Sequence, residues 1–325
     1  MNKYVLIIIA SLSLAGCQTN MFGPKVYGRY VPERKDDFAW ENEYAAFRMY
    51  GPALADENPS NGVDLWLKNS PALVIDTMYA RELKEGRPYH VNYDGNLDCY
   101  KVGHTAGAGG LVIVKDNGEG LKANGERANA KVYVGGPYSA WQILEQTNKR
   151  FSFKLHYDSL PVEDQLYEAD MIITAEAGNL LNKAQVVLKA KGEKTDGEGQ
   201  MAKGEELLLG GGIFLHDTME RAMVDFSKGA IAYAENALSD KHAAKLNYIH
   251  NHSLSQGRSY IAVVTPGATI TDRVDGTFVS VRPYTLGDTL TYYFGGCWSK
   301  WRDGKKTFRT DEAWFKAIDQ WQEQE

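Results

Sequence analysis

Cysteine is scarce in this sequence, which has only 3 in 325 residues: Cys17, Cys99 and Cys297. The chain is therefore not a small disulfide-framework protein, although a bond between Cys99 and Cys297 stays open as an alternative. Basic runs interleaved with aromatic residues are also missing, and the net charge is -6 with a pI near 5.7. Both features argue against nucleic acid as a partner. An anionic ligand would have to be met by a local cluster of arginine or lysine side chains.

A phosphate-binding loop is missing too, although the segment "GHTAGAGG" (residues 103–110) is rich in glycine. It lacks the Lys-Ser/Thr pair of a nucleotide cradle, and the apolar run "LVIV" that follows it indicates a strand instead of a long helix. We therefore interpret the glycines as positions where the backbone turns sharply and approaches a ligand, or packs tightly beneath one.

The first residues have the pattern of a targeting signal. Lys3 provides a positive charge, an apolar run follows it, and small residues precede Cys17. This pattern predicts a secretory signal that is too short to be a membrane span. The ending "LAGC" resembles the lipobox of bacterial lipoproteins, which implies lipidation of Cys17. Gln18 after the cysteine favours the outer membrane, facing the periplasm or the cell surface. The alternative is a soluble secreted protein with an incidental cysteine.

Long helical periodicity is scarce, and short runs rich in Val, Ile, Tyr and Phe alternate with Gly, Asn and Asp. In "RFSFKLHY" (residues 150–157), apolar and polar residues alternate as in a half-buried antiparallel strand, with His156 on the polar side. Five other runs also predict strands; they cover residues 110–114, 185–190, 259–266, 276–284 and 289–296. Many strands at short intervals predict an all-β fold, a large antiparallel β-sandwich.

One helix is predicted, at the C-terminus. Thr310 is its cap, acidic residues occupy its first turn, and Trp314, Ile318 and Trp321 line one face. The charged, glycine-rich tract at residues 189–206 predicts an exposed loop. We therefore predict a signal peptide at residues 1–16, a linker at 17–30 and a single β-sandwich domain at 31–325.

Four segments resemble a known family when taken in order. They are "VPERKDDFAWENEYAAFRMYGPAL" (31–54), "NGVDLWLKNSPALVIDTMY" (61–79), "YHVNYDGNLDCYKVGHTAGAGG" (89–110) and "YYFGGCWSKW" (292–301). Together they resemble the domain-of-unknown-function family 4861, found among bacterial proteins that degrade acidic polysaccharides. The segment at 168–190 is also similar to the galactose-mutarotase-like supersandwich. This second likeness is an analogy of fold only.

The family resemblance implies an activity on acidic polysaccharides. Related proteins are understood to dehydrate the uronic acid at the non-reducing end of oligosaccharides, which leaves a 4,5-unsaturated uronate. Asn92 stands where an acidic residue is more usual, and Cys99 stands where an aromatic residue is expected. The first of these departures puts the activity in doubt if that acidic residue is a ligand or a base.

Dehydration next to a carboxylate is a β-elimination, which needs a base, an acid and a group that holds the carboxylate. In the light of the resemblance, His90 and His104 are the candidate base and acid, and Tyr100 is the alternative acid. Without the family resemblance, a single His more often has a structural role, and a Tyr in a strand more often packs in the core.

Candidates for substrate binding come mainly from the first segment. Arg48 is the candidate carboxylate clamp, since a guanidinium forms two parallel hydrogen bonds with a carboxylate. Its alternative is a salt bridge to a neighbour such as Glu41. Trp40 could stack on a sugar ring or pack in the core, and Asn42 and His216 are further candidates.

Asp94 and Asp98 in "DGNLD" are candidate ligands of a divalent cation such as Ca²⁺. The spacing does not match an EF-hand, and an ordinary turn explains "YDGN" without a metal. Zinc on His90, His104 and an aspartate lacks a supporting motif. The sequence therefore leaves the cofactor open.

The leading hypothesis is a lyase or dehydratase for uronic acid ends, with an acidic oligosaccharide as partner. One alternative is a mutarotase or epimerase on the same fold. The other is a lipoprotein that binds acidic oligosaccharides without catalysis and contacts the membrane only through its lipid anchor.

Overall fold

The computed structural model describes residues 23–57, 59–116, 118, 127–191, 207–216, 223–227, 229–237 and 256–324. Cys17 with the predicted signal peptide and most of the loop predicted at 189–206 lie outside these residues. So do Asp217, the neighbour of the candidate His216, and the two histidines of "YIHNHS", His250 and His252. Within the described part of the chain, no helix is long and apolar enough to cross a membrane.

The first sheet has five strands in sequence order, and all neighbours are antiparallel. Its first strand begins at Tyr27, so this sheet includes the last residues of the predicted linker. The five strands are β1 (Tyr27–Val31), β2 (Asp37–Glu41), β3 (Ala45–Met49), β4 (Asp64–Lys68) and β5 (Asn96–Asp98).

The second sheet has eight strands in the order β13-β14-β15-β18-β11-β10-β9-β8. The predicted alternation in β9 is confirmed, because Phe151, Phe153, Leu155 and Tyr157 are buried. The strands are β8 (Ala140–Gln146), β9 (Arg150–Val162), β10 (Gln165–Glu176), β11 (Asn182–Ala190), β13 (Met223–Ser227), β14 (Ala230–Asn236), β15 (Arg258–Val264) and β18 (Leu290–Trp298).

The third sheet has five strands in the order β16-β17-β12-β6-β7. They are β6 (Ala108–Asp116), β7 (Ala130–Tyr133), β12 (Leu207–Phe214), β16 (Ile270–Val274) and β17 (Thr277–Tyr284). A short hairpin of β19 (Arg302–Asp303) and β20 (Lys306–Thr307) precedes the last helix.

The eight-stranded sheet packs on both five-stranded sheets. Phe294 of β18 contacts the rings of Trp40 and Phe47 in the first sheet, and Tyr233 of β14 contacts Phe278 in the third. A parallel bridge between Val63 and Gly107 links the two five-stranded sheets, which together form the second layer of the sandwich. The expected all-β antiparallel sandwich is thus confirmed.

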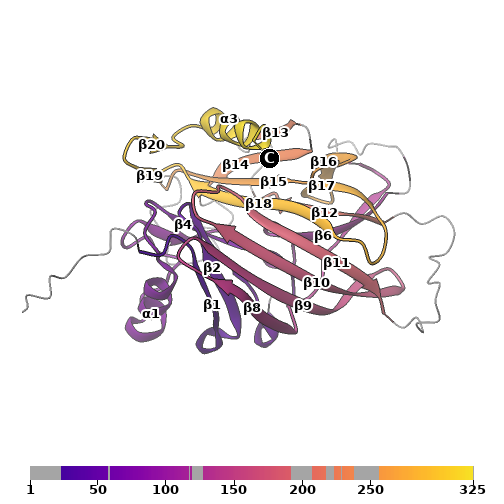
Figure 1. The fold of residues 1–325 in the computed structure, drawn as a ribbon, viewed down its shortest axis with the longest axis horizontal. Coiled ribbons are helices and arrows are strands. Elements are labelled where there is room, and N and C mark those ends of the chain that lie inside the picture. Colours follow the sequence, from indigo (N-terminus) through magenta and orange to yellow (C-terminus); the bar gives the residue numbers. More distant parts are fainter. Residues whose placement is uncertain are drawn as a thin grey trace, which may run out of the picture.

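Two helices lie against the sheets. Helix α3 (Asp311–Gln322) packs Trp314 on Tyr260 of β15, and its predicted cap is present, because Thr310 Oγ1 accepts a hydrogen bond from Ala313 N at 3.2 Å. Helix α1 (Ile75–Glu85), which our sequence analysis did not predict, covers the outer face of the first sheet. Figure 1 shows α3 beside β13 and β14 and α1 near β1.

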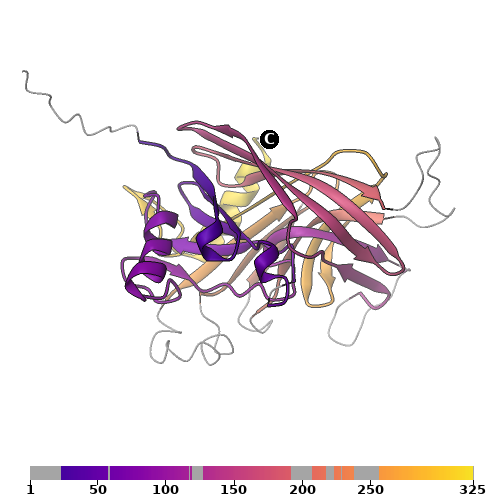
Figure 2. The same ribbon diagram turned by 90° about the horizontal axis from the view of Figure 1, so that it is seen from below.

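The first sheet and α1 gather at one end of the molecule, in indigo and purple in Figure 2, while the long magenta strands run along the upper side. Two short 3-10 turns also belong to this region, at Pro32–Arg34 and Pro52–Leu54. The first sheet therefore has one face in the sandwich core and one face beneath α1.

All six strand runs that the sequence predicted are confirmed; they correspond to β6, β9, β11, β15, β17 and β18.

Cys99 and Cys297 are both buried and both free, so the disulfide alternative does not hold.

Candidate functional site

The face of the first sheet beneath α1 carries a buried cluster of charges. Strand alternation places Asp37, Arg48, Asp64 and Asp98 on this face, while Phe38, Phe47 and Leu65 point into the sandwich core. Arg48 lies directly opposite Asp64 in the register of β3 and β4. The same alternation thus builds an apolar core on one side and an ion cluster on the other.

Arg48 is the centre of this cluster, and its guanidinium is fully occupied. Its Nε and Nη2 atoms contact Asp64 at 2.9 and 2.5 Å, and Nη2 also contacts Asp98 at 3.1 Å. Its Nη1 atom donates to Tyr89 Oη at 2.9 Å and lies 3.4 Å from Asp37. The side chain is buried, so Arg48 serves the protein's own carboxylates.

The cluster holds more carboxylates than a single arginine can balance. Burial raises the pKa of Asp37 and of Asp64 to about 6, and that of Asp98 to about 7, although the positive charge of Arg48 opposes the shift in each case. Protons are therefore held here near neutral pH by groups that ordinarily lose them in acid. Such a perturbation is typical of functional sites, although structural ion networks also show it.

His90 lies at the edge of the cluster, in the chain that follows α1. Its Nδ1 atom is 3.1 Å from the carbonyl oxygen of Asp98 and 3.4 Å from the Asp98 carboxylate. A carbonyl oxygen can only accept a hydrogen bond, so in neutral His90 the proton sits on Nδ1 and the lone pair on Nε2. About 25 % of the side chain remains exposed.

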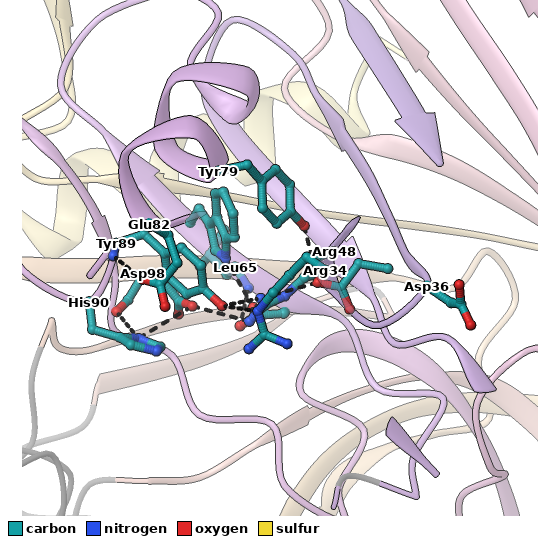
Figure 3. Close-up of polar contacts among 12 residues, drawn as sticks. Arg34, Asp36, Arg48, Leu65, Tyr79, Glu82, Tyr89, His90 and Asp98 are labelled. Atoms are coloured by element: carbon teal, nitrogen blue, oxygen red, sulfur yellow. Dashed lines mark hydrogen bonds and ion pairs between the residues drawn. The ribbon is translucent and has the colours of Figure 1, made fainter. Parts of the chain in front are cut away.

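The electrostatic surroundings keep His90 neutral. Burial and the charge of Arg48 lower the pKa of His90 below its usual value of 6.5. Figure 3 shows His90 at one end of the cluster, joined through Asp98 and Tyr89 to the arginines. The backbone carbonyl of Asp98 orients the imidazole, while Arg48 holds the Asp98 carboxylate 3.4 Å from the same Nδ1 atom. Chemically, the arrangement presents a neutral, oriented imidazole at a partly exposed position.

Tyr89 connects the cluster to a second arginine. Its hydroxyl oxygen accepts hydrogen bonds from Arg48 Nη1 and, at 3.1 Å, from Arg34 Nε. Tyr89 also stacks on Trp66 and packs its ring edge near His90. Arg34 and His90 therefore border the same buried group.

A second polar group lies at the end of β12. His216 Nδ1 is 3.2 Å from Glu235 Oε1, and the other oxygen of Glu235 accepts from Tyr233 at 2.7 Å. Tyr100 packs edge-on against His216, with ring centroids 4.3 Å apart. The structure thus brings together Tyr100 and His216, two of the candidates from the sequence.

Tyr100 itself is held firmly. It is buried, and its hydroxyl lies 2.8 Å from the carbonyl of Phe214 and 3.1 Å from that of Gly107. Burial raises its pKa well above the usual value. These contacts connect the chain after β5 with the end of β12.

Trp40 lies on the core-facing side of the first sheet, and Asn42 lies in the turn between β2 and β3. Trp40 is fully buried, stacks on Phe47 and donates to Asn182 Oδ1 at 3.2 Å. The Asn42 side chain accepts hydrogen bonds from the backbone N–H groups of Tyr44 and Ala45 at 2.9 and 3.0 Å. Both side chains therefore make contacts that shape the fold between β2 and β3.

His104 is exposed, in the turn before β6. No hydrogen bond or ion pair among the described residues joins it to His90. Asn92 accepts from Gly95 N at 2.9 Å and donates to Gln256 at 3.1 Å. The assignment of His90 and His104 as base and acid therefore stays a prediction.

Asp94 and Asp98 face different partners. Asp94 is exposed and pairs with Arg81, whereas Asp98 is buried beside Arg48. In the described part of the chain, no group of three or more His, Cys, Asp or Glu side chains is arranged to hold a metal ion. A cation at this place would have to displace an arginine from one of the two aspartates.

The glycine run packs against neighbouring strands. Gly107 has φ +61°, and a Cβ there would lie 2.2 Å from the carbonyl oxygen of Val63. At Gly109, with φ +114°, a Cβ would lie 2.5 Å from the Phe294 side chain. Of the two interpretations of the glycines, tight packing is the one that these contacts support.

Four site residues were not candidates in the sequence analysis: Arg34, Asp37, Asp64 and Tyr89. Their signal was present, because Asp37 and Glu41 in β2 and Asp64 and Lys68 in β4 carry charges at positions of one parity. An isolated strand with that pattern is ordinarily interpreted as facing solvent. The missing information was helix α1, which buries this face.

The fold and the site together define an all-β sandwich protein with a buried Arg–Asp cluster beneath a helix, and a partly exposed histidine at its edge. The model of the family described as "Domain of unknown function (DUF4861)" matches residues 18–325, so the chain belongs to this family. It is also 24 % identical over 305 residues to the protein named "Uncharacterized protein P7" from Formosa agariphila. The match covers 91 % of this chain and 67 % of that relative.

Proposed function

We propose that the protein is a carbohydrate-active lyase or dehydratase that acts by β-elimination on the non-reducing-end uronic acid of acidic oligosaccharides. The observation that carries the proposal is His90, a neutral imidazole that Asp98 orients through Nδ1. The Nε2 lone pair removes the proton on C5 of the uronate. The C4=C5 double bond then forms, and O4 leaves as water after it receives a proton.

Two side chains are candidates for the acid that protonates O4. His104 is exposed and can therefore contact a substrate that arrives from solvent. Tyr100 is buried, and its hydroxyl already donates to two backbone carbonyls. The structural contacts therefore favour His104 over Tyr100 as the proton donor. Removing each side chain separately distinguishes them.

The test is the ultraviolet absorbance of the conjugated ene-carboxylate product. The mature protein is mixed, with and without chelator, with a panel of oligosaccharides that carry saturated glucuronate or iduronate at the non-reducing end. We expect a rising signal that His90→Gln abolishes and that His156→Gln leaves unchanged. His156 is a matched control, because it is a partly exposed histidine that also contacts a carboxylate, that of Asp170 at 2.8 Å.

Other outcomes would support the alternatives. A flat trace with exchange of the C5 proton for deuterium would overturn the elimination and favour the epimerase. A flat trace with tight binding would favour the oligosaccharide-binding lipoprotein. Loss of signal with chelator alone would show a divalent cation that the proposal does not include.

We propose in addition that Cys17 is lipidated and anchors the protein to the bacterial outer membrane, facing the periplasm or the cell surface. The support is the leader-like sequence and the small residues before the cysteine. Labelling with a radioactive fatty acid should mark the wild type and not Cys17→Ala. A wild-type chain without label would overturn the anchor.

A further inference from the structure

Arg48, the candidate carboxylate clamp from the sequence, has no donor left for a substrate. Its five N–H groups meet Asp64 twice, Asp37, Asp98 and Tyr89, and only 4 % of the residue is exposed. Binding a substrate carboxylate here would require removal of one of the protein's own anions. The clamp must therefore be sought at the border of the cluster.

Arg34 has the opposite character. Its Nε atom donates to Tyr89 Oη at 3.1 Å, and no carboxylate among the described residues forms an ion pair with it. Its Nη1 atom is buried without any hydrogen-bond partner in the described structure. A buried guanidinium N–H without an acceptor is unfavourable, and an anion that accepts from it would relieve that cost.

A second unpartnered atom lies in the same cluster. Asp37 is fully buried, and its Oδ1 atom has no hydrogen-bond partner among the described residues, although Oδ2 accepts from Tyr79 and Arg48. Arg34 and Asp37 are near enough for the charge of Arg34 to act on the pKa of Asp37, yet they do not form an ion pair. The cluster therefore contains, within the described structure, an acceptor atom without a donor, Asp37 Oδ1, and a donor atom without an acceptor, Arg34 Nη1.

The place of Arg34 relative to His90 agrees with the chemistry. Both residues contact Tyr89, one through its hydroxyl and the other through its ring. Both are only partly buried, unlike Arg48 and the aspartates. A uronate carboxylate on Arg34 would place the substrate at the side of the cluster where the imidazole of His90 is exposed.

We infer that Arg34 is the residue that receives the carboxylate of the uronic acid, while Arg48 holds Asp98 and Tyr89 in position beneath it. This inference rests on the proposed function for the identity of the anion. It makes Arg34 a substrate-binding residue that determines specificity for acidic over neutral sugar ends.

The experiment measures binding separately from turnover. Calorimetric titration, carried out in the His90→Gln background so that the sugar is not consumed, compares a tetrasaccharide ending in saturated glucuronate with its carboxyl-reduced counterpart, which ends in glucose. We expect the chain with Arg34 to prefer the acid, and the added change Arg34→Gln to lose about tenfold or more in affinity for the acid and almost none for the reduced sugar. Arg34→Lys should recover part of the preference, because lysine keeps the positive charge but cannot form the two parallel hydrogen bonds of a guanidinium.

The matched control is Arg29→Gln. Arg29 is also partly exposed and lies on the neighbouring strand, but it already pairs with Glu33 and Asp76. Thermal melting checks that all the variants fold. An acid preference that survives Arg34→Gln, or that Arg29→Gln removes equally, would overturn the inference.

The inference and the proposed function fail in different ways. If the acid preference depends on Arg34 but no ene-carboxylate forms, elimination is wrong and the anion site stands. If elimination proceeds and Arg34→Gln changes neither affinity nor KM, the anion site is wrong and elimination stands. A chain with Arg34 that binds neither sugar overturns the anion site.

Discussion

Two buried ion clusters lie on the same face of the first sheet, and they differ in balance. At one end, Lys68 contacts Glu41 at 2.9 Å, and Glu41 also accepts from the backbone N–H groups of Val74 and Ile75 where α1 begins. At the other end, Arg48 faces three aspartates, and Asp37 keeps an unpartnered oxygen. One cluster is satisfied and the other is not.

The difference separates structure from function. The Lys68–Glu41 pair attaches α1 to the sheet and has one cation for one anion, so it needs nothing from outside. The Arg48 cluster has an excess of carboxylates with raised pKa values, unfilled hydrogen-bond groups and a histidine at its border. Perturbed carboxylates of this kind are typical of functional sites, although structural ion networks also show them, so we interpret the Arg48 cluster as part of the proposed site.

Replacing His90 should give the largest effect. His90→Gln removes the proposed base, so the elimination rate should fall by about 100-fold or more, while the free energy of unfolding changes by less than about 1 kcal/mol. Because the pKa of His90 is lowered from 6.5, the midpoint of the acid limb in the wild-type pH–rate profile should lie below pH 6.5. A pH–rate profile with its acid limb above pH 6.5 would contradict the role of His90.

Breaking the balanced pair should mainly affect stability. Lys68→Met leaves Glu41 buried without its cation, so the free energy of unfolding should fall by about 3–5 kcal/mol in urea denaturation. The double variant Glu41→Gln with Lys68→Met removes both charges and should recover part of that loss. Equal losses in the single and double variants would show that the two charges do not interact.

Neutralising Asp98 should change how stability depends on pH. The folded pKa of Asp98, about 7, is raised from its usual 3.8, so its stabilising contribution is full below pH 3.8 and is lost as pH rises to about 7. Asp98→Asn lacks this loss. Relative to the wild type, the variant should therefore gain stability between these pH values, on the order of a few kcal/mol, in urea denaturation at a series of pH values.

The matched control for this experiment is Asp94→Asn, which changes an exposed carboxylate in the same segment. It measures the effect of losing a carboxylate from this segment at the same series of pH values. A stability curve for Asp98→Asn that runs parallel to that of the wild type would mean that Asp98 titrates alike in the folded and unfolded chain.

Removing the Tyr89 hydroxyl should have the smallest effect of the four. Tyr89→Phe leaves an N–H of Arg34 and one of Arg48 without their phenol acceptor, which should cost about 1–3 kcal/mol of unfolding free energy. Tyr79→Phe is the control, because Asp37 keeps its contact with Arg48 when the Tyr79 hydroxyl is lost. A larger loss in the control than in Tyr89→Phe would reverse this ranking.

The strands were predictable because apolar and polar residues alternate along a strand that buries one face. In β9 the apolar residues from Phe151 to Tyr157 stand at every second position and are buried, and the sandwich class follows from many such runs. Helix α3 was predictable from its cap and its apolar face. Helix α1 also has a signal, in Ile75, Met78 and Tyr79 at helical spacing, but the stretch is short and is followed by exposed charges.

The site was only partly predictable. His90, Arg48 and Asp98 were candidates from the sequence, but their connection was not, because it depends on β3, β4 and β5 lying side by side. Asp37 and Asp64 have a pattern that ordinarily indicates a solvent-facing side, and only the cover of α1 makes them buried. Arg34 belongs to a 3-10 turn without periodicity, so no sequence pattern indicates its contact with Tyr89.

The order of the eight-stranded sheet has a consequence for how the chain is made. Strand β18, near the C-terminus, lies between β11 and β15, which precede it in the chain. Until residues 290–298 have been synthesised, β11 and β15 each have an unpaired edge that can pair with other chains. A chain that stops before β18 therefore cannot close the sheet. Folding to the native sandwich has to wait until synthesis is almost complete, and the unfinished chain needs protection from aggregation until then.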